Sequence, residues 1–246
     1  RAILDLIDKY FPDCQMINMD ATVTSIRLKS DEELQELYDR KVRHLYLGIE
    51  SGLDDVLKFM RKEHTQDQAY KEIARIQKVG LIFDAHVMSG VAGKGRGQEN
   101  AIALAEFLNK TQPDRIVNFS LFLHNQVALY EDIKSGAFIP ADEVENMEEE
   151  RTLIELLKEG PDGHQMLYDG FNDFLELRVK GKVPKDAPRM IEKLTEAIEK
   201  YKDEPPIYAY VKGDCPDLSM CDGGRWLWEM DDSKLAQYNE KEKKLS

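Results

Sequence analysis

Two acidic residues stand where strand-like runs end and could accept hydrogen bonds from a ligand. Asp20 closes the apolar run 14–20, and Glu50 follows the run 44–49 in the sequence Glu50-Ser51-Gly52. Their carboxylates could take hydrogen bonds from an amine or from ribose hydroxyls. A structural interpretation is equally open, in which both acids cap the following segments and the glycines turn the chain.

Four short apolar runs alternate with helical patterns in the first half of the chain and would bring these acids together. We predict strands at 14–20, 44–49, 81–88 and 115–123. Helices are expected at 53–60 and 99–109. Two further helices should begin at Ser30 and Thr65, which have capping-box spacing to Glu33 and Gln68 respectively. Strands that alternate with helices pair in parallel, so their carboxyl ends meet at one ligand-binding edge. The pattern suits a doubly wound sheet or part of a β/α barrel.

The rest of the chain has a different pattern. Helices are expected at 127–134, 141–158 and 188–202, followed by a tail that contains Cys215, Cys221, Trp226 and Trp228. An acidic cluster at the start of the second of these helices is interpreted as a solvated face: Asp142, Glu143, Glu145, Glu148, Glu149 and Glu150. We therefore divide the chain into a β/α part (1–125), a mostly helical part (126–204) and a tail (205–246).

Composition narrows the possible partners and location. The 246 residues include 34 Lys+Arg and 47 Asp+Glu, which gives a net charge of −13. This charge repels phosphate backbones, so nucleic-acid binding is not expected. No segment approaches the roughly 20 apolar residues of a membrane helix. Three cysteines are too few for a disulfide framework, so we expect a cytoplasmic location.

Two histidines are assigned from the pattern alone. His86 lies within the predicted strand 81–88, where a satisfied core histidine is the structural interpretation. His44 stands at the start of the run 44–49, where we expect an exposed residue. The glycines at 90, 93, 95 and 97 form a loop after the third strand, but they match neither GxGxxG nor a P-loop.

Three stretches in succession resemble the radical S-adenosylmethionine (SAM) superfamily. They are GIESG at 48–52 followed by DDVLKFMRK, SGVAG at 89–93, and PDRIVNFSLF at 113–122 followed by ALYEDIKSGAF. The sequence is most similar to the branch that includes oxygen-independent coproporphyrinogen oxidase and methylthiotransferases. The resemblance extends over roughly residues 1–200, and the succession of motifs is more specific than any one of them.

This resemblance implies a partial (β/α)6 barrel of about four parallel strands with helices, plus a mostly helical C-terminal extension. Family members hold a 4Fe-4S cluster through a CxxxCxxC loop, with SAM bound to the cluster. An electron from the cluster cleaves SAM to a 5′-deoxyadenosyl radical, which abstracts hydrogen from the substrate. The partners implied are a substrate that is either a small molecule or of unknown class, and an electron donor such as flavodoxin or ferredoxin.

The chain departs from the family at the cluster loop, because it contains no CxxxCxxC motif. We expect the C-terminal part of a radical SAM enzyme, inactive by itself, with the cluster loop before Arg1. Apolar surface exposed at the barrel edge could then drive self-association. The alternative is a non-catalytic β/α binding or scaffold protein that has lost the cluster half. Cys215 and Cys221 leave an auxiliary cluster open.

The resemblance also implies roles in SAM binding for particular residues. Asp20 matches an acidic position that faces SAM, and Glu50 and Ser51 belong to the GIESG motif in the SAM pocket. Lys62, with Arg61 as the neighbouring candidate, falls at the basic position that pairs with the SAM carboxylate.

The remaining positions of the implied pocket concern the nucleoside. His86 falls where relatives often place an acid on the ribose hydroxyls, and histidine can still hydrogen-bond a hydroxyl. Gly90, Val91 and Phe122 lie where the adenine would stack or meet the backbone.

Overall fold

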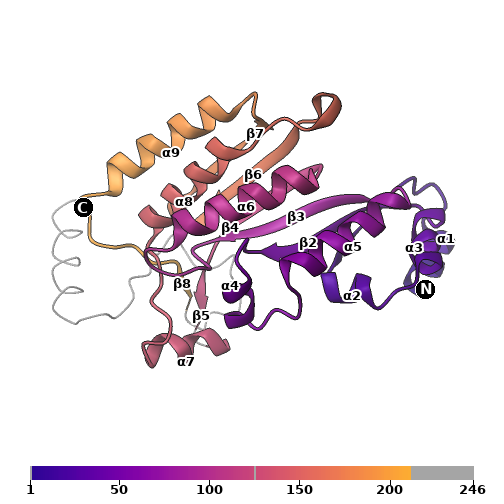
Figure 1. The fold of residues 1–246 in the computed structure, drawn as a ribbon, viewed down its shortest axis with the longest axis horizontal. Coiled ribbons are helices and arrows are strands. Elements are labelled where there is room, and N and C mark those ends of the chain that lie inside the picture. Colours follow the sequence, from indigo (N-terminus) through magenta and orange to yellow (C-terminus); the bar gives the residue numbers. More distant parts are fainter. Residues whose placement is uncertain (1, 125, 212–246) are drawn as a thin grey trace.

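A six-stranded sheet forms the centre of the computed structural model, which describes residues 2–124 and 126–211. The strands lie in the order β1 (Ile17–Ala21), β2 (Val42–Glu50), β3 (Ile82–Ser89), β4 (Arg115–Ser120), β6 (Met166–Asn172) and β7 (Leu177–Val183) (Figure 1). The first five are parallel, and β7 is antiparallel to β6. A small second sheet pairs β5 (Leu123–His124) with β8 (Tyr210–Val211).

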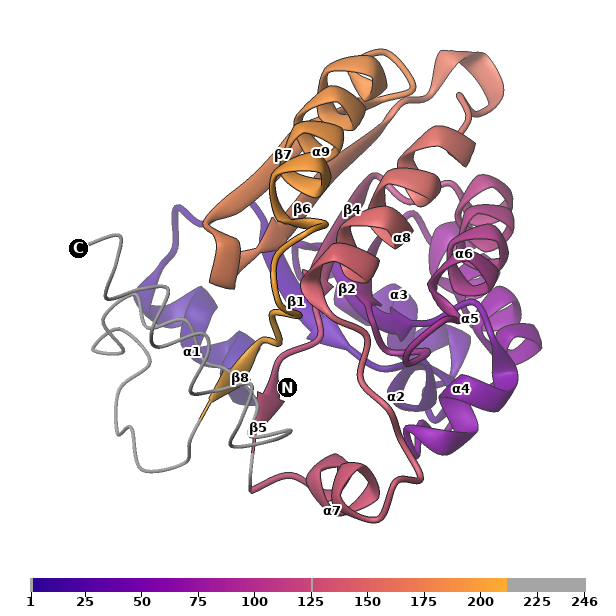
Figure 2. The same ribbon diagram turned by 90° about the vertical axis from the view of Figure 1, so that its left-hand side faces the viewer.

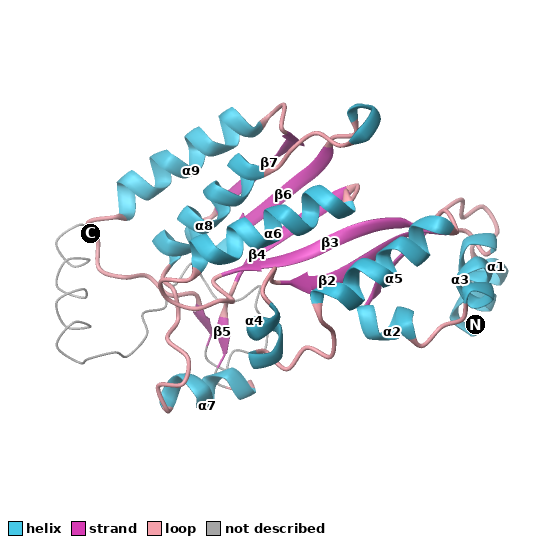
Figure 3. Ribbon diagram, in the orientation of Figure 1, coloured by secondary structure: helices cyan, strands magenta, loops and turns pink. Residues whose placement is uncertain are grey.

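Helices fill the connections between the strands. They are α1 (Ala2–Tyr10), α2 (Val23–Arg27), α3 (Asp31–Asp39), α4 (Asp54–Phe59), α5 (Gln66–Lys78), α6 (Gly97–Thr111), α7 (Ala128–Lys134), α8 (Glu143–Leu156) and α9 (Ala187–Tyr201), with 3-10 turns η1 (Pro161–Gly163) and η2 (Asp173–Leu175). Helices α5, α6, α8 and α9 lie along one face of the sheet (Figures 2 and 3).

The order of the strands distinguishes the two architectures that the sequence allows. A doubly wound sheet reverses its direction at a switch point and carries helices on both faces. Here the parallel strands follow chain order across the sheet, so successive crossovers of one hand place their helices on the same face. The sheet is therefore wound like part of a β/α barrel, which confirms the predicted fold class.

Alternation along β2 shows how the core forms. Leu45, Leu47 and Ile49 are almost completely buried and belong to the main hydrophobic core. His44 and Tyr46, which flank Leu45, are half-buried on the opposite side of the strand. We call that opposite side the open face of the sheet, because successive side chains of a strand point to opposite faces.

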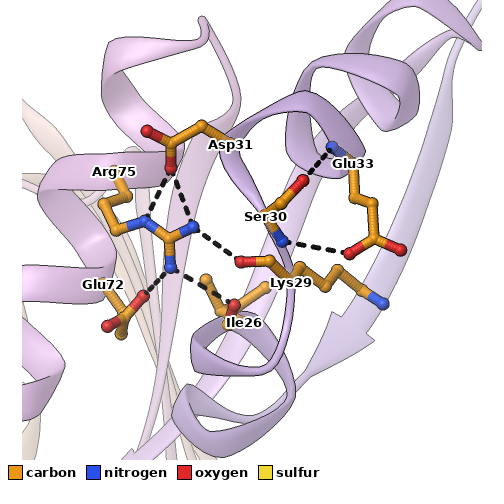
Figure 4. Close-up of polar contacts among 7 residues, drawn as sticks. All are labelled: Ile26, Lys29, Ser30, Asp31, Glu33, Glu72 and Arg75. Carbon is orange, nitrogen blue, oxygen red and sulfur yellow. Dashed lines mark hydrogen bonds and ion pairs between the residues drawn. The ribbon is translucent and has the colours of Figure 1, made fainter.

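Both predicted capping boxes are present, and one of them lies beside an arginine that ties two helices together. Ser30 Oγ accepts the Glu33 N–H at 3.2 Å, while Glu33 Oε2 accepts the Ser30 N–H at 3.0 Å. Arg75 of α5 donates to Asp31 at 2.8 Å and to the Lys29 carbonyl at 2.7 Å (Figure 4). The start of α3 is thereby fixed on α5, within the helical layer beside the sheet.

The segment 126–204 contains two strands, β6 and β7, that were not predicted from the sequence. Asp169 and Gly170 interrupt the apolar run of β6, and both residue types are rare in strands. Asp169 is accommodated because Arg178 and Lys180 on β7 pair with it at 2.8 and 3.0 Å. The expected roles of Cys215, Cys221, Trp226 and Trp228 concern residues outside the described ranges.

Among the described residues, the helices are all too short or too polar to cross a membrane.

Candidate functional site

A carboxylate and an ammonium group meet at the carboxyl end of β2. Glu50 Oε1 accepts a hydrogen bond from Lys62 Nζ at 2.7 Å, and the two side chains are 16% and 37% exposed. Glu50 has a left-handed φ of 64°, which is uncommon for a residue with a side chain. The ion pair therefore lies at the carboxyl edge of the sheet and remains accessible to solvent.

Gly48 provides the space in which this pair forms. A Cβ atom on Gly48 would lie 2.7 Å from Glu50 Oε1 and 3.8 Å from Lys62 Nζ. Of the two basic candidates, Lys62 is the one placed at Glu50. Arg61 instead reaches Asp132 at 3.4 Å and is mostly exposed.

His86 lies on the open face of the sheet and is half-buried. Its ring is 5.1 Å from the ring of Tyr46 and 5.7 Å from the ring of Phe119. Tyr46 is in turn the register partner of Asp20 on β1, where Asp20 is exposed. His86 is therefore not a fully buried core histidine, and together with Asp20 it faces the side on which a ligand could approach.

The aromatic row on the open face continues across β4 and β6. Phe119 stacks on Phe171 with 5.7 Å between ring centroids, and the Arg178 guanidinium lies 4.5 Å from the Phe171 ring. Phe119 is 37% exposed. Flat side chains joined to a cation offer stacking surface to a planar ligand. Phe171 and Arg178 could not be predicted from the sequence as site residues, because they lie in β6 and β7, two strands that were not expected.

A chain of buried hydrogen bonds joins the loop after β2 to the loop after β3. Ser51 is fully buried, and its Oγ donates to Asn100 Oδ1 at 2.6 Å. Asn100 Nδ2 donates to Glu149 Oε1 at 2.7 Å, and Glu149 Oε2 accepts the Gly90 N–H at 2.9 Å. Ser51 and Gly90 therefore connect the carboxyl edge of the sheet to helices α6 and α8. Their predicted contacts with a cofactor stay predictions.

The interpretation of the acidic cluster as a solvated helix face is wrong for three of its members. Glu143, Glu149 and Glu150 of α8 are between 1% and 2% exposed. Helix α8 packs on β3, β4 and β6, so these side chains point between the helix and the strand ends. Sequence alone showed only a run of acids, because the groups that donate hydrogen bonds to them lie on other elements: β4, β6, α6 and the loop after β3.

Each of these carboxylates has neutral hydrogen-bond partners instead of a cation. Glu143 accepts from Ser120 Oγ at 2.8 Å, and Glu150 accepts from Tyr168 Oη at 3.1 Å and Asn172 Nδ2 at 2.7 Å. Burial raises the pKa of Glu143, Glu149 and Glu150 to about 7, against the lowering effect of these hydrogen bonds. The carboxyl ends of β4 and β6 and the loop after β3 are thus hydrogen-bonded to titratable groups.

Val91 and Phe122 are not brought together with the Glu50–Lys62 pair by any contact that the structure records. Val91 is 4% exposed and packs with Val56 and Ala92 in a small apolar cluster. Phe122 follows β4 and is 50% exposed. A groove of about 350 Å³ runs beside Val91, between α4, the glycine loop and residues 137–139.

The described cysteine does not fit an iron–sulfur cluster. Cys14 precedes β1, and its thiol donates to the Met16 carbonyl at 3.3 Å. Clusters of this kind need several thiolates close together. The described part of the chain therefore offers no ligand set for a 4Fe-4S cluster.

Comparisons with known proteins place these features in context. No family model matches the chain. A tRNA-2-methylthio-N(6)-dimethylallyladenosine synthase of Acinetobacter baumannii is 32% identical over 101 residues, which are 39% of this chain and 20% of that protein. A tRNA uridine(34) acetyltransferase of Methanocaldococcus infernus is 24% identical over 120 residues, 48% of this chain and 22% of that protein. The chain spans about a fifth of the length of these relatives.

A solved structure supports the fold. The archaeal Elp3 of Methanocaldococcus infernus with an N-terminal deletion superposes with a TM-score of 0.56 at 18% identity, over 76% of this chain and 42% of that chain. These relatives are members of the radical SAM superfamily. The resemblance to that superfamily, predicted from the motifs, is therefore confirmed.

Proposed function

We propose that the chain contributes the SAM-binding half of a radical SAM enzyme. The observation that carries this proposal is the solvent-accessible Glu50–Lys62 ion pair at the carboxyl edge of the sheet. SAM carries an α-ammonium and an α-carboxylate on the same carbon. An adjacent carboxylate and ammonium are complementary to such a zwitterion, whereas either charge alone would match only half of it.

In the complex the pair would open to admit the amino-acid end of SAM. Glu50 would accept hydrogen bonds from the ligand ammonium, and Lys62 would donate to the ligand carboxylate. Because Gly48 has no side chain, the amino-acid end can approach the backbone beside the pair. Lysine acts here as a point charge, so the contact fixes the carboxylate less rigidly than the fork of an arginine would.

The nucleoside would extend along the open face from this pair. His86 is the register partner of Gly48 on the neighbouring strand, so it lies beside the space that Gly48 leaves. Its ring nitrogens can hydrogen-bond ribose hydroxyls, and Asp20 offers a second acceptor on the same face. Phe122, with its half-exposed ring, is the described side chain proposed to stack on adenine.

The described residues bind and orient SAM in this proposal and do no redox chemistry. SAM supplies hydrogen abstraction when it is bound beside a reduced iron–sulfur cluster. The described residues offer no ligands for such a cluster, so we assign no electron transfer to them.

Calorimetry with SAM and with adenosine tests the proposal. Lys62→Met removes the partner of the ligand carboxylate and should weaken SAM binding by about tenfold or more, since charged hydrogen bonds contribute about 1.5 to 3 kcal/mol. Adenosine lacks the amino-acid end, so its affinity should not change in this variant. The matched control is Lys58→Met, an exposed lysine on the neighbouring helix α4.

Equal SAM affinities for Lys62→Met and Lys58→Met would contradict the role of the ion pair. Equal losses for SAM and adenosine in Lys62→Met would contradict it as well, because the effect would then not lie at the amino-acid end. Circular dichroism of both variants confirms that the fold is kept.

A further inference from the structure

A second group of potential ligand atoms lies at the opposite end of the sheet from the Glu50–Lys62 pair. His44 is the third residue of β2, Asp84 is the third residue of β3, and Asp114 directly precedes β4. One ligand atom from each of these side chains lies within 4.8 Å of the other two. These three strands are neighbours in the sheet, so their amino ends bring the group together (Figure 1).

The expectation that His44 is an exposed residue before its strand is wrong. Its side chain is 17% exposed, and its Nδ1 lies 2.6 Å from Asp84 Oδ2. A carboxylate that contacts one ring nitrogen fixes the orientation of the imidazole. His44 is thus held in place by a neighbour on the next strand.

Asp84 is the residue that points to a missing ligand. Its side chain is completely buried, and its second oxygen, Oδ1, has no hydrogen-bond partner. Among the described residues, neither Asp84 nor Asp114 forms an ion pair with a lysine or an arginine. A buried carboxylate oxygen without a partner is costly, and a cation is the ligand that would remove the cost most fully.

The types of ligand atom indicate which cation. One imidazole nitrogen and two carboxylates suit a first-row divalent ion, because imidazole selects against Mg²⁺ and Ca²⁺, which prefer oxygen ligands alone. Zn²⁺ binds such mixed sites among the tightest of these ions. With three protein ligands, one coordination position would stay open to water.

We propose that His44, Asp84 and Asp114 form a binding site for a divalent first-row cation, with Zn²⁺ as the reference ion. The ion would bind between His44 Nδ1 and the Asp84 carboxylate, whose two oxygens can both coordinate it, so that Oδ1 also gains a partner. It would move their ligand atoms apart to about 3 to 3.4 Å, the separation set by bonds of about 2.1 Å. Asp114, which is exposed, closes the site from the solvent side.

Zinc titration by calorimetry tests the site. Because thiolates also bind zinc, the 246-residue chain is used with Cys14, Cys215 and Cys221 changed to serine. One equivalent of Zn²⁺ should bind, and both Asp114→Ala and His44→Gln should weaken its affinity at least tenfold. Asp67→Ala, an exposed acid on α5, is the matched control and should leave the affinity unchanged.

Two results would overturn the proposal. One is the absence of zinc binding by a chain whose circular dichroism shows the native fold; the Asp84–His44 pair would then be a closed structural contact. The other is zinc binding that both Asp114→Ala and His44→Gln leave unchanged, because the ion would then lie elsewhere. Neither result bears on SAM binding at the other end of the strands.

Discussion

Glu149 Oε2 accepts the backbone N–H of Gly90 at 2.9 Å, so a carboxylate of α8 holds the loop that follows β3. Its other oxygen accepts from Asn100 of α6. Both contacts are buried, so the position of this loop depends on one side chain from a helix far along the sequence. The carboxyl edge of the sheet is therefore supported from the helical side.

Removing the Glu149 side chain should lower the free energy of unfolding by more than the net contribution of its two hydrogen bonds. Glu149→Ala leaves the Gly90 N–H and the Asn100 amide buried without a partner, at a cost of about 3 kcal/mol in unfolding free energy. Urea denaturation measures the change. Glu155→Ala, an exposed glutamate on the same helix, should stay within about 0.5 kcal/mol of the parent. Similar values for the two variants would contradict the bracing role.

Stability should depend on pH through the three buried glutamates of α8. Their pKa rises from 4.5 to about 7 on folding, so between these values the native state keeps protons that the unfolded chain releases. Their contribution is complete below about pH 4.5, falls as the pH rises, and is lost above about pH 7. Each group can change the free energy of unfolding by on the order of 1 to 3 kcal/mol.

Glu143→Gln isolates this effect, because glutamine can donate to Ser120 and accept from Asn146 as a protonated Glu143 would. Urea denaturation at pH 5 and pH 8 compares the variant with the parent. The variant should lose less stability at pH 8, whereas Glu155→Gln should follow the parent. An unchanged pH dependence in Glu143→Gln would show that Glu143 titrates normally.

Gly90 should tolerate a side chain less well than a glycine of similar backbone conformation. Gly90 and Gly95 both have positive φ, at 82° and 76°. A Cβ on Gly90 would clash with Asn146 Oδ1, whereas a Cβ on Gly95 would meet nothing within 4 Å. Gly95→Ala should cost about 1 kcal/mol from backbone strain alone.

Gly90→Ala adds displacement of the buried Asn146 to that strain and should cost about 1 to 3 kcal/mol more. Thermal unfolding of both variants gives the comparison. Equal unfolding temperatures would mean that Asn146 moves aside freely.

Self-association is a further proposal, drawn from the apolar surface around α1. Exposed apolar side chains gather on this helix and on its link to β1: Ile3, Leu6, Tyr10, Phe11 and Met16. A groove of about 540 Å³ runs along the same segment. Apolar patches of this kind favour association.

Sedimentation velocity over a range of concentrations tests it. The parent should associate, and Leu6→Lys with Phe11→Lys should shift the chain toward monomer. Ile102→Lys, on the exposed side of α6, should not. A parent that is monomeric at all concentrations would refute the proposal.

The strands and helices with strong periodicity could be predicted from the sequence. The predicted strand at 44–49 is observed within β2, and the two capping-box pairs are found at the starts of α3 and α5. Local hydrophobic patterns and caps are enough to specify such elements. β6 could not be predicted in this way. Its Asp169 is stable in a strand only through Arg178 and Lys180, and β7 brings them close only in the folded sheet.

Likewise, only some residues of the candidate site could be predicted from the sequence. Glu50 and Lys62 lie 12 residues apart across a helix, and the resemblance was needed to connect them. The burial of Glu149 could not be foreseen, because a run of acids on a helix is usually solvated. Its partners Gly90 and Asn100 come from other elements, and only packing of α8 on the strand ends places them within reach.

Titration of the 15N-labelled chain with SAM distinguishes binding at the carboxyl edge of the sheet from binding elsewhere. Binding at the Glu50–Lys62 pair should shift the backbone amides of Gly48, Glu50, Ser51 and Lys62, whereas those of His44 and Asp84 at the amino ends of the strands should stay unchanged. Shifts confined to other regions, or none at saturating SAM, would contradict it.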